Sequence, residues 1–518
     1  MLAKTLSAAI SGLEVSAVEV EVDLRRQLES QESQRGTVMT IGGLPDTAIR
    51  ESRERIWAAL RETGAFLPQN SRITVNLAPA DLRKSGTAFD LPIALCLMRL
   101  LGQMPAPSTL ERTMVIGELA LDGGVRPTRG ALSIAMAARG MGLERLIVPQ
   151  ENAREAAMAE GIDVFGVQTL REALELLANP GARQPQPSEA SALFTVERED
   201  GPDFSDVKGQ ESAKRAIVAA AAGGHNLLLI GNPGCGKTLM AKRIPGILPP
   251  LTLPEALEVT KIHSIAGVLD SRRGLVTLRP FRSPHHTISD GGLVGGSANP
   301  RPGELSLAHN GVLFLDELPE FRRSTLEVLR QPLESGEVTL ARASGTFTFP
   351  AKVMLVAAMN PCPCGYYGSR VRRCTCTPFQ IQSYRSRLSG PLVDRLDMHI
   401  EIASVTHDQL IGRRNGLSSQ TMREQVLQAR DIQYRRFQGT SVRCNADMAG
   451  RLLDDCCHLG PDEQTLVRQI ITDLRLSARA YDRILKVART LADLDGHPDI
   501  SAVNLREAAT YRFLDRQE

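Results

Sequence analysis

Hydrophobic and polar residues alternate with a period of two in short runs along the first third of the chain. The clearest alternating runs are EVEVDL at 19–24 and RITVNLA at 72–78, and a further β-type run, RLIVP at 145–149, is continuously apolar after its first residue. Such alternation is typical of strands with one buried face. Ala- and Leu-rich runs of helical length lie between them, at 89–102 and 131–142. We therefore expect an α/β domain over residues 1–177.

The rest of the chain divides into three parts. Residues 178–203 contain ANPGARQPQPSEAS, which is rich in Pro, Gln and Ser and lacks periodicity, so a linker is predicted. Over 204–404 apolar strand runs again alternate with loops and helical stretches, as expected of a second α/β domain. Residues 405–518 are predicted to form a helical lid. Its helical runs lie at 419–437, 461–474, 477–494 and 501–513.

Composition limits the classes of partner and compartment. The net charge is only +2, so any nucleic-acid face must come from local clusters of basic residues. No apolar run reaches the roughly 18 residues of a membrane span, and the N-terminus has no sustained apolar core, so neither a membrane segment nor a secretory signal is predicted. The nine cysteines, in a chain without export signals, favour a reducing cytoplasm.

A glycine-rich loop between a strand and a helix predicts a nucleotide site. HNLLLIGNPGCGKTLMAKRI, at 225–244, has phosphate-loop spacing, in which backbone N–H groups and a helix N-terminus face phosphate. Lys237 is predicted to contact the β- and γ-phosphates of ATP, and Thr238 to ligate Mg²⁺. The alternative, a chance glycine turn, is disfavoured by the flanking strand and helix. The predicted loop residues are Gly231, Asn232, Pro233, Gly234, Cys235 (a small filler rather than a nucleophile), Gly236, Lys237 and Thr238.

Two later apolar runs end in polar residues that complete such a site. GVLFLDEL at 311–318 places Asp316 and Glu317 after a short strand. Asp316 suits the Mg²⁺ shell, and Glu317 suits polarisation of the attacking water. AKVMLVAAMN at 351–360 ends in Asn360, whose amide can orient the same water. Together these residues predict an ATPase.

Four of the nine cysteines lie in one loop, MNPCPCGYYGSRVRRCTCTP at 359–378. Four thiolates satisfy tetrahedral Zn²⁺, whose binding contributes about 10–16 kcal/mol of apparent folding free energy in zinc-finger peptides. The Cys-x-Cys spacing is tighter than the usual Cys-x₂-Cys, and reduced structural thiols or a redox or iron–sulfur role are the alternatives. A metal here would hold Arg370, Arg372 and Arg373 near Asn360. The candidate ligands are Cys362, Cys364, Cys374 and Cys376.

Three stretches resemble AAA+ ATPases of the Mg-chelatase-like, ComM/YifB-type family. FSDVKGQESAKRAI at 204–217 is similar to the adenine-side segment, with Gly209 and Gln210. RLSGPLVDRLDMHIE at 387–401 resembles a stretch whose arginine, here Arg395, enters a neighbour's ATP site as a finger. LSARAYDRILKVARTLADL at 476–494 resembles the lid segment whose arginine, here Arg479, senses the γ-phosphate. For either arginine, a surface salt bridge is the alternative. A finger acting in trans implies a ring, a hexamer as in the family.

The N-terminal domain resembles the Lon-protease-type domain that this family carries. RKSGTAFDLPIALCL at 83–97 is similar to the stretch with the protease nucleophile, and residues 116–138 to the stretch with its lysine. The two positions fall on Ala88 and Leu132, which supply neither an activated hydroxyl nor its base. We therefore expect no proteolysis.

Two basic stretches are candidates for contacting DNA. PFRSPHHTIS at 280–289 lies in a Gly-, Pro- and Arg-rich insertion, and GEVTLARASGTFTFPA at 336–351 is typical of a β-hairpin with its tip at 343–345. In the family and in replicative helicases such stretches project into the ring channel, where basic loops suit sequence-independent phosphate contacts. Subunit contacts are the alternative. The predicted DNA-binding residues are Arg282, Ser283, His285, His286 and Arg342.

The resemblance implies a helicase that promotes branch migration during homologous recombination of transforming DNA. Its ligands would be ATP and Mg²⁺, and its partner single-stranded or branched DNA. A motor subunit for metal insertion into a porphyrin and a non-DNA protein remodeller are the alternatives.

Overall fold

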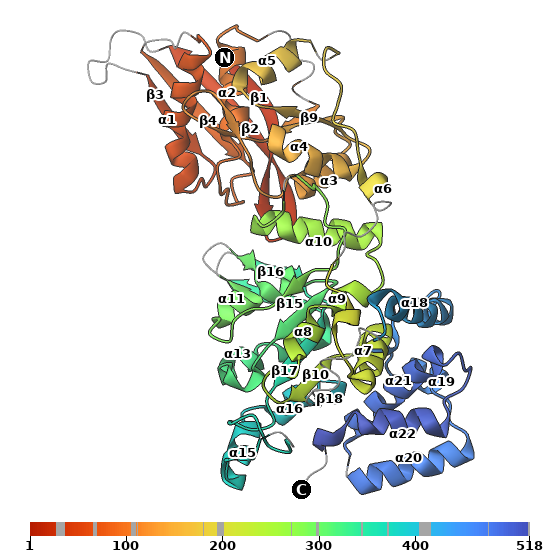
Figure 1. Cartoon of the computed structure of the whole chain (residues 1–518). Coiled ribbons are helices and arrows are strands. Elements are labelled where there is room, and N and C mark those ends of the chain that lie inside the picture. The colour runs from red at the N-terminus through yellow and green to blue at the C-terminus, as the bar shows by residue number, and fades with distance from the viewer. Residues whose placement is uncertain are drawn as a thin grey trace. The chain divides into compact units, whose positions relative to one another are not determined.

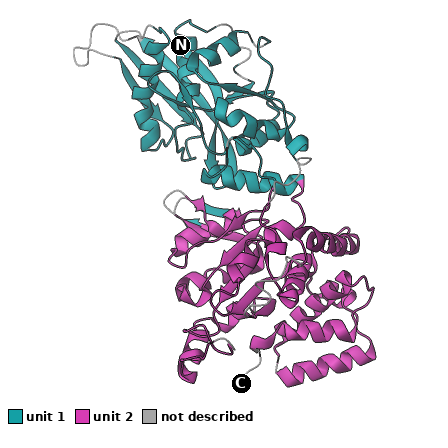
Figure 2. Ribbon diagram, in the orientation of Figure 1, with its two compact units in different colours: residues 1–196, 253–277, 341–348 teal, residues 197–252, 278–340, 349–518 magenta. Residues whose placement is uncertain are grey.

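The computed structural model divides the chain into two compact units (Figures 1 and 2). Unit 1 comprises residues 1–196, 253–277 and 341–348, and unit 2 comprises residues 197–252, 278–340 and 349–518. The domain boundaries expected from the sequence, at 177, 203 and 404, stay a prediction. The structure describes the chain except for residues 27–36, 66–69, 105–109, 111, 180, 194–200, 271, 297–299, 343–344, 370–371, 404–415, 475 and 516–518.

Unit 1 is built on a seven-stranded mixed sheet of order β3-β4-β2-β1-β5-β8-β9. β2 pairs antiparallel with β1 and β4, and the other neighbours pair parallel. The alternation seen in the sequence is structural, since Val18, Val20 and Val22 of β2 are completely buried. The strands are β1 (Leu2–Ser11), β2 (Glu14–Arg26), β3 (Val38–Gly42), β4 (Ser71–Ala78), β5 (Thr113–Val115), β8 (Arg145–Pro149) and β9 (Asp163–Val167), with a small ribbon of β6 (Glu118–Leu119) and β7 (Val125–Arg126).

Helices pack on both faces of this sheet. Residues of α1, α2 and α5 share one apolar core with β2 and β4, whereas α3 and α4 pack against β8 and β9. The α10 helix comes from the middle of the chain yet packs against α3, so it belongs to unit 1. The helices are α1 (Thr47–Glu62), α2 (Asp90–Leu100), α3 (Ala131–Gly140), α4 (Gln150–Ala156), α5 (Leu170–Ala178), α6 (Ala190–Leu193) and α10 (Leu253–Ala266).

Unit 2 contains a five-stranded parallel sheet of order β11-β14-β17-β10-β18. All the carboxyl ends of its strands therefore meet at one edge, where open α/β sheets bind ligands. Each of the apolar runs at 227–230, 312–315 and 354–359 forms one of these strands. They are β10 (Leu227–Gly231), β11 (Phe281–Arg282), β14 (Val312–Leu315), β17 (Met354–Met359) and β18 (Met398–Ile402).

The loops of this sheet carry short elements. β15 (Glu337–Arg342) and β16 (Gly345–Pro350) pair as the predicted hairpin, whose tip includes residues outside the described part of the chain. β12 (Gly295–Gly296) and β13 (Arg301–Pro302) form a second ribbon. The short helices are α8 (Lys237–Ala241), α9 (Ile244–Ile247), α11 (Asp290–Val294), α12 (Glu304–Leu307), α13 (Arg323–Glu327), α14 (Arg330–Ser335), α15 (Pro378–Arg385) and α16 (Gly390–Val393).

The C-terminal helices share a continuous apolar core with the sheet. α18 and α21 pack on α7 (Glu211–Gly223), the helix that precedes β10 (Figure 1). The four helices predicted from the sequence in this region are present, and α19 is an addition. Among the described residues, none of the helices combines the length and the apolar character that crossing a membrane requires. The C-terminal helices are α18 (Ser419–Arg436), α19 (Arg451–Cys456), α20 (Pro461–Leu474), α21 (Ala478–Leu494) and α22 (Ala502–Thr510).

Candidate active site

The phosphate loop joins the end of β10 to the start of α8, and glycine determines its shape. Gly234 and Gly236 have φ values of 77° and 95°, in the left-handed region that disfavours side chains. A Cβ at either residue would meet no atom within 4 Å, so both face open space. At Gly231 a Cβ would stand 2.6 Å from the carbonyl oxygen of Ile402 on the neighbouring strand. Gly234 and Gly236 are therefore required by their backbone conformation, and Gly231 by close packing.

Lys237 is a buried cation held by the loop and by Asn360. Its Nζ donates to the carbonyl oxygens of Gly231 and Asn232 at 2.5 and 3.0 Å and to Oδ1 of Asn360 at 3.2 Å. Burial lowers the pKa of this ammonium. An anionic phosphate beside it would offset the desolvation and favour the charged form. The structure thus brings Asn360 and Lys237 together, as the parallel sheet order requires.

Thr238 and Asp316 form a pair of hard oxygen ligands. The Thr238 hydroxyl donates to Oδ2 of Asp316 at 2.7 Å, and Asp316 is the first residue after β14. Mg²⁺ prefers oxygen ligands and takes only one or two from the protein when phosphates supply others. The two side chains therefore fit a Mg²⁺ site that nucleotide phosphates and water complete.

Glu317 is an exposed carboxylate on an unusual backbone. Its φ is 51°, in the left-handed region, where residues other than glycine are uncommon and often mark functional sites. Its Oε2 lies 3.7 Å from Nδ1 of His286, whose ring packs edge-on to Phe321. The sequence offers His286 as a DNA ligand, and no sequence signal indicates its place beside Glu317. That contact depends on how the loop after β11 folds back over β14.

The segment predicted to face adenine reaches this edge of the sheet, as does the rest of the phosphate loop. Gly209 and Gln210 both have φ values of 63°, and Nε2 of Gln210 donates to the carbonyl oxygen of Ala403 at 2.6 Å, just after β18. Pro233 is exposed, whereas Cys235 is buried. Burial raises the pKa of the Cys235 thiol, in keeping with a filler rather than a nucleophile.

Arg395 lies between α16 and β18 and is packed against other residues of its own chain. Only 7% of the residue is exposed. Its guanidinium donates to the carbonyl oxygens of Arg330 and Pro391 at 3.0 and 2.6 Å and pairs with Glu334. The finger role stays a prediction, and it requires this side chain to leave Glu334.

Helix α21, which belongs to the predicted lid, is anchored beside the phosphate-loop strand. Ser477 caps its N-terminus, and Arg479 is exposed in its first turn. One turn later Arg483 pairs with Asp397, whose Oδ2 accepts the backbone N–H of Asn226 at 2.8 Å. Asn226 directly precedes β10, so this contact ties the helix that carries Arg479 to the start of the phosphate-loop strand.

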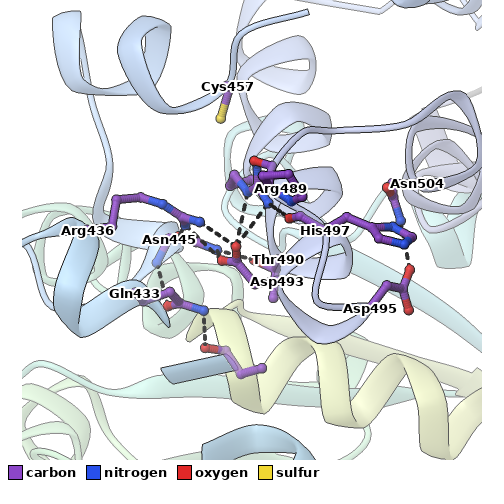
Figure 3. Close-up of polar contacts among 12 residues, drawn as sticks. Gln433, Arg436, Asn445, Cys457, Arg489, Thr490, Asp493, Asp495, His497 and Asn504 are labelled. Carbon is purple, nitrogen blue, oxygen red and sulfur yellow. Dashed lines mark hydrogen bonds and ion pairs between the residues drawn. The ribbon is translucent and has the colours of Figure 1, made fainter. Parts of the chain in front are cut away.

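The buried carboxylate of Asp493 fixes the C-terminal end of α21 (Figure 3). Asn445 donates its side-chain amide to this carboxylate and its backbone N–H to Gln433. The side-chain amide of Gln433 in turn donates to the carbonyl oxygen of Ala222 in α7. The network therefore links α18, α21 and α7, and its charges are hydrogen-bonded as burial requires. The side chains that donate to the Asp493 carboxylate are Arg436, Arg489 and Asn445.

Comparison with known proteins now assigns the family. A model described as "Magnesium chelatase, subunit ChlI" matches residues 203–410, and models for "Subunit ChlI of Mg-chelatase" and its C-terminal part match residues 28–152 and 416–512. YifB of Salmonella typhimurium is 42% identical over 99% of this chain and 98% of its own length. Competence protein ComM of Haemophilus influenzae is 41% identical, with the same coverage. The chain belongs to the Mg-chelatase-like family of ComM/YifB type.

The same comparisons bear on the two units. Lon protease 2 of Bacillus subtilis is 29% identical over 135 residues, which are 26% of this chain and 24% of that protein. The mixed α/β fold with its parallel ATPase sheet confirms the predicted fold class. Membership of an AAA+ family supports ATP and Mg²⁺ as the ligands of the site built from Lys237, Thr238 and Asp316.

Ala88 and Leu132, the residues predicted to stand at the protease nucleophile and lysine positions, both lie in unit 1. The carbonyl oxygen of Ala88 accepts the N–H of Gly117 at 3.0 Å. Leu132 is buried in α3, and its N–H donates to Oε1 of Glu155 at 2.9 Å. Glu155 also accepts the hydroxyl of Ser264 from α10, and burial raises the pKa of its carboxyl.

The cysteine loop brings its four sulfurs together. All four Sγ atoms lie within 4.8 Å of one another, and Cys362 is completely buried. All nine cysteines of the chain are free thiols. Of the three arginines expected near this loop, Arg372 and Arg373 are exposed, and Arg370 lies outside the described residues. The cluster therefore fits a four-thiolate metal site.

The predicted DNA-binding residues have different surroundings. Ser283, His285 and Arg342 are exposed. Arg282 instead forms a two-pronged pair with Glu304, with both N···O distances 2.6 Å. A role of Arg282 in DNA contact stays a prediction and competes with this pair.

Proposed function

We propose that this protein is a ring-forming, ATP-driven DNA motor that promotes branch migration during homologous recombination of transforming DNA. The observation that carries the proposal is the convergence of Lys237, Thr238, Asp316 and Asn360 at one edge of a parallel sheet. Family membership supports nucleotide hydrolysis, and the relative named competence protein ComM supports a link to DNA uptake.

In the proposed reaction the protein positions ATP and stabilises developing charge. Lys237 would neutralise the β- and γ-phosphates, and Thr238 and Asp316 would hold a Mg²⁺ ion that supplies further positive charge. Glu317 polarises the attacking water and Asn360 orients it. The exposed carboxylate of Glu317 and the hydrogen bond between Asn360 and Lys237 are compatible with these roles.

We propose that each site is completed by a neighbouring protomer in a hexamer. Arg395 would leave Glu334 and approach the neighbour's γ-phosphate, where an arginine finger contributes about 10³–10⁵ in rate. Arg479 would sense the γ-phosphate from the lid, and its exposure in the first turn of α21 supports that role.

DNA, single-stranded or branched, is the proposed polymer in the ring channel. The exposed residues Ser283, His285 and Arg342 would contact its phosphates without reading sequence. His286 lies beside Glu317, so the same loop reaches both the proposed DNA face and the hydrolytic site. Because unpaired cysteines are typical of a reducing compartment, we propose a cytoplasmic location, with zinc in the cysteine loop.

The proposal is tested by ATP turnover with and without DNA, together with strand separation of forked duplexes and four-way junctions. We expect DNA to stimulate ATP turnover, and the forked duplexes and four-way junctions to be separated in an ATP-dependent manner. Glu317→Gln is the inactive control. No stimulation and no strand separation would contradict the DNA motor. That outcome would favour the metal-insertion motor or the protein remodeller, of which the family models for magnesium chelatase favour the former.

A further inference from the structure

The cysteine loop begins directly after Asn360, the residue proposed to orient the attacking water. β17 stops at Met359, Asn360 follows, and Cys362 comes two residues later. Cys362 is completely buried, whereas most residues from 363 to 377 are exposed or half-buried. The loop therefore has little apolar area with which to fix its own conformation.

The sulfur positions match one tetrahedral metal ion. The Sγ of Cys362 lies 3.3 Å from that of Cys364 and 3.7 Å from that of Cys374, and the Cys364–Cys374 distance is 3.5 Å. A Zn–S bond of about 2.3 Å gives a tetrahedral S···S edge of about 3.7 Å. Backbone N–H groups also face the sulfurs, as in the contact from Tyr367 to Cys362 at 3.3 Å. Cys376 contributes in the same way, since its Sγ accepts the N–H of Cys364 at 3.4 Å.

The same loop packs directly on the phosphate loop. A Cβ placed on Gly365 would stand 2.6 Å from both Cγ and Cδ of Pro233 and 3.9 Å from the side-chain amide carbon of Asn360. Gly365 also has a φ of 84°, which follows from the turn that the cysteines close. The backbone between Cys364 and Tyr366 is thus in contact with both the ATP-binding loop and Asn360.

We propose that a Zn²⁺ ion held by Cys362, Cys364, Cys374 and Cys376 positions Asn360 and Pro233, so that the metal-loaded loop sets the rate of ATP hydrolysis. The inference rests on the proposed ATPase function. It assigns the metal a positioning role: the ion touches no substrate and acts through Asn360 on the water and through Pro233 on the phosphate loop. A displacement of about 1 Å in such groups can cost about 100-fold in rate.

Metal removal from the full-length protein is the first test. We expect about one equivalent of zinc in protein purified without a metal-affinity tag. A chelator with a thiol-blocking mercurial, followed by excess dithiothreitol, should lower kcat for DNA-independent ATP turnover about 10–100-fold, and added Zn²⁺ should restore it. Circular dichroism should show the metal-free protein still folded. Full turnover by metal-free protein, or less than about half an equivalent of zinc after reconstitution, would overturn the inference.

A matched pair of glycine variants isolates the contact from the metal. Gly365 and Gly368 lie in the same loop with φ values of 84° and 73°, but a Cβ on Gly368 would meet no atom within 4 Å. Both variants therefore carry similar backbone strain, and only Gly365→Ala pushes on Pro233. We expect Gly365→Ala to keep its zinc and lose about ten-fold in kcat/KM for ATP, with Gly368→Ala within two-fold of the parent protein.

Equal rates for the two variants would overturn the coupling. The result does not depend on the DNA proposal, because both experiments are read without DNA. If zinc content and ATP turnover behave as expected while no four-way junction is separated, only the proposal of a DNA motor fails. If no turnover occurs even in zinc-loaded parent protein, the ATPase proposal fails first.

Discussion

The edge of the unit 2 sheet that holds Lys237, the nucleotide edge, and the surroundings of Glu155 in unit 1 use their polar side chains differently. At the nucleotide edge Thr238, Asp316 and Asn360 are half-buried and Glu317 is exposed, so each retains access to a ligand. In unit 1 the residue Glu155 is only 4% exposed, and its carboxylate accepts hydrogen bonds from inside the protein. Polar groups that saturate one another stabilise a fold, whereas polar groups left accessible at strand ends can act on a substrate.

The largest expected effect is on the rate of ATP hydrolysis and concerns Glu317, the exposed carboxylate. Glu317→Gln should lower the rate of ATP hydrolysis about 10²–10⁴-fold, because an amide cannot polarise the attacking water as a carboxylate does. ATP affinity should change little, since Lys237 and Thr238 are intact. Turnover and equilibrium binding of a fluorescent ATP analogue measure the two quantities.

Glu320 supplies the matched control for that substitution. It is an exposed carboxylate one turn further on and pairs with Arg387. Glu320→Gln should hydrolyse ATP within about two-fold of the parent rate. Comparable losses in both variants would mean that local charge, and not a specific role of Glu317, is responsible.

The second effect concerns Glu155, the buried carboxylate that accepts hydrogen bonds inside the protein. Its loss should lower stability and leave ATP turnover unchanged. Glu155→Ala would leave the N–H of Leu132 and the hydroxyl of Ser264 without their acceptor, at a cost of about 1–3 kcal/mol. The melting midpoint of unit 1 should fall by several degrees, while ATP turnover per folded molecule stays within two-fold. Glu151→Ala, an exposed carboxylate on the same helix, should leave the midpoint unchanged. A loss of ATP turnover in Glu155→Ala without a loss of stability would contradict the purely structural role of Glu155.

The smallest effect is a pH dependence within unit 2. His225 is completely buried beside Thr490, and burial lowers its pKa to about 4. Below its ordinary pKa of about 6.5 the unfolded chain binds a proton that the native state does not, so stability is lost as the pH falls from about 6.5 to 4. Between pH 7 and 5 this histidine should cost about 2 kcal/mol.

Thermal unfolding at the two pH values measures that cost. The melting midpoint of unit 2 should fall by about 4 °C more in the parent protein than in His225→Gln, whose side chain does not titrate. Equal falls in the two proteins would show that other groups account for the acid sensitivity.

Sequence patterns predict those parts of the site that follow strand ends. Asp316 and Asn360 each follow an apolar run, and parallel pairing then brings them to the edge that holds Lys237. The contacts of His286 with Glu317 and of Arg395 with Glu334 could not be predicted, because they join side chains far apart in the chain whose positions depend on loop packing. Likewise no sequence signal indicates that α10 packs in unit 1.

The central claim is that ATP is hydrolysed at seams between protomers, with Arg395 supplied by a neighbour. The direct measurement is ATP turnover by co-assembled Lys237→Ala and Arg395→Ala protomers. Each variant alone should be nearly inactive, whereas an equal mixture should recover about a quarter of the parent rate, because that fraction of seams joins an intact phosphate loop to an intact arginine. A mixture as inactive as its components, or full turnover by Arg395→Ala alone, would contradict the account.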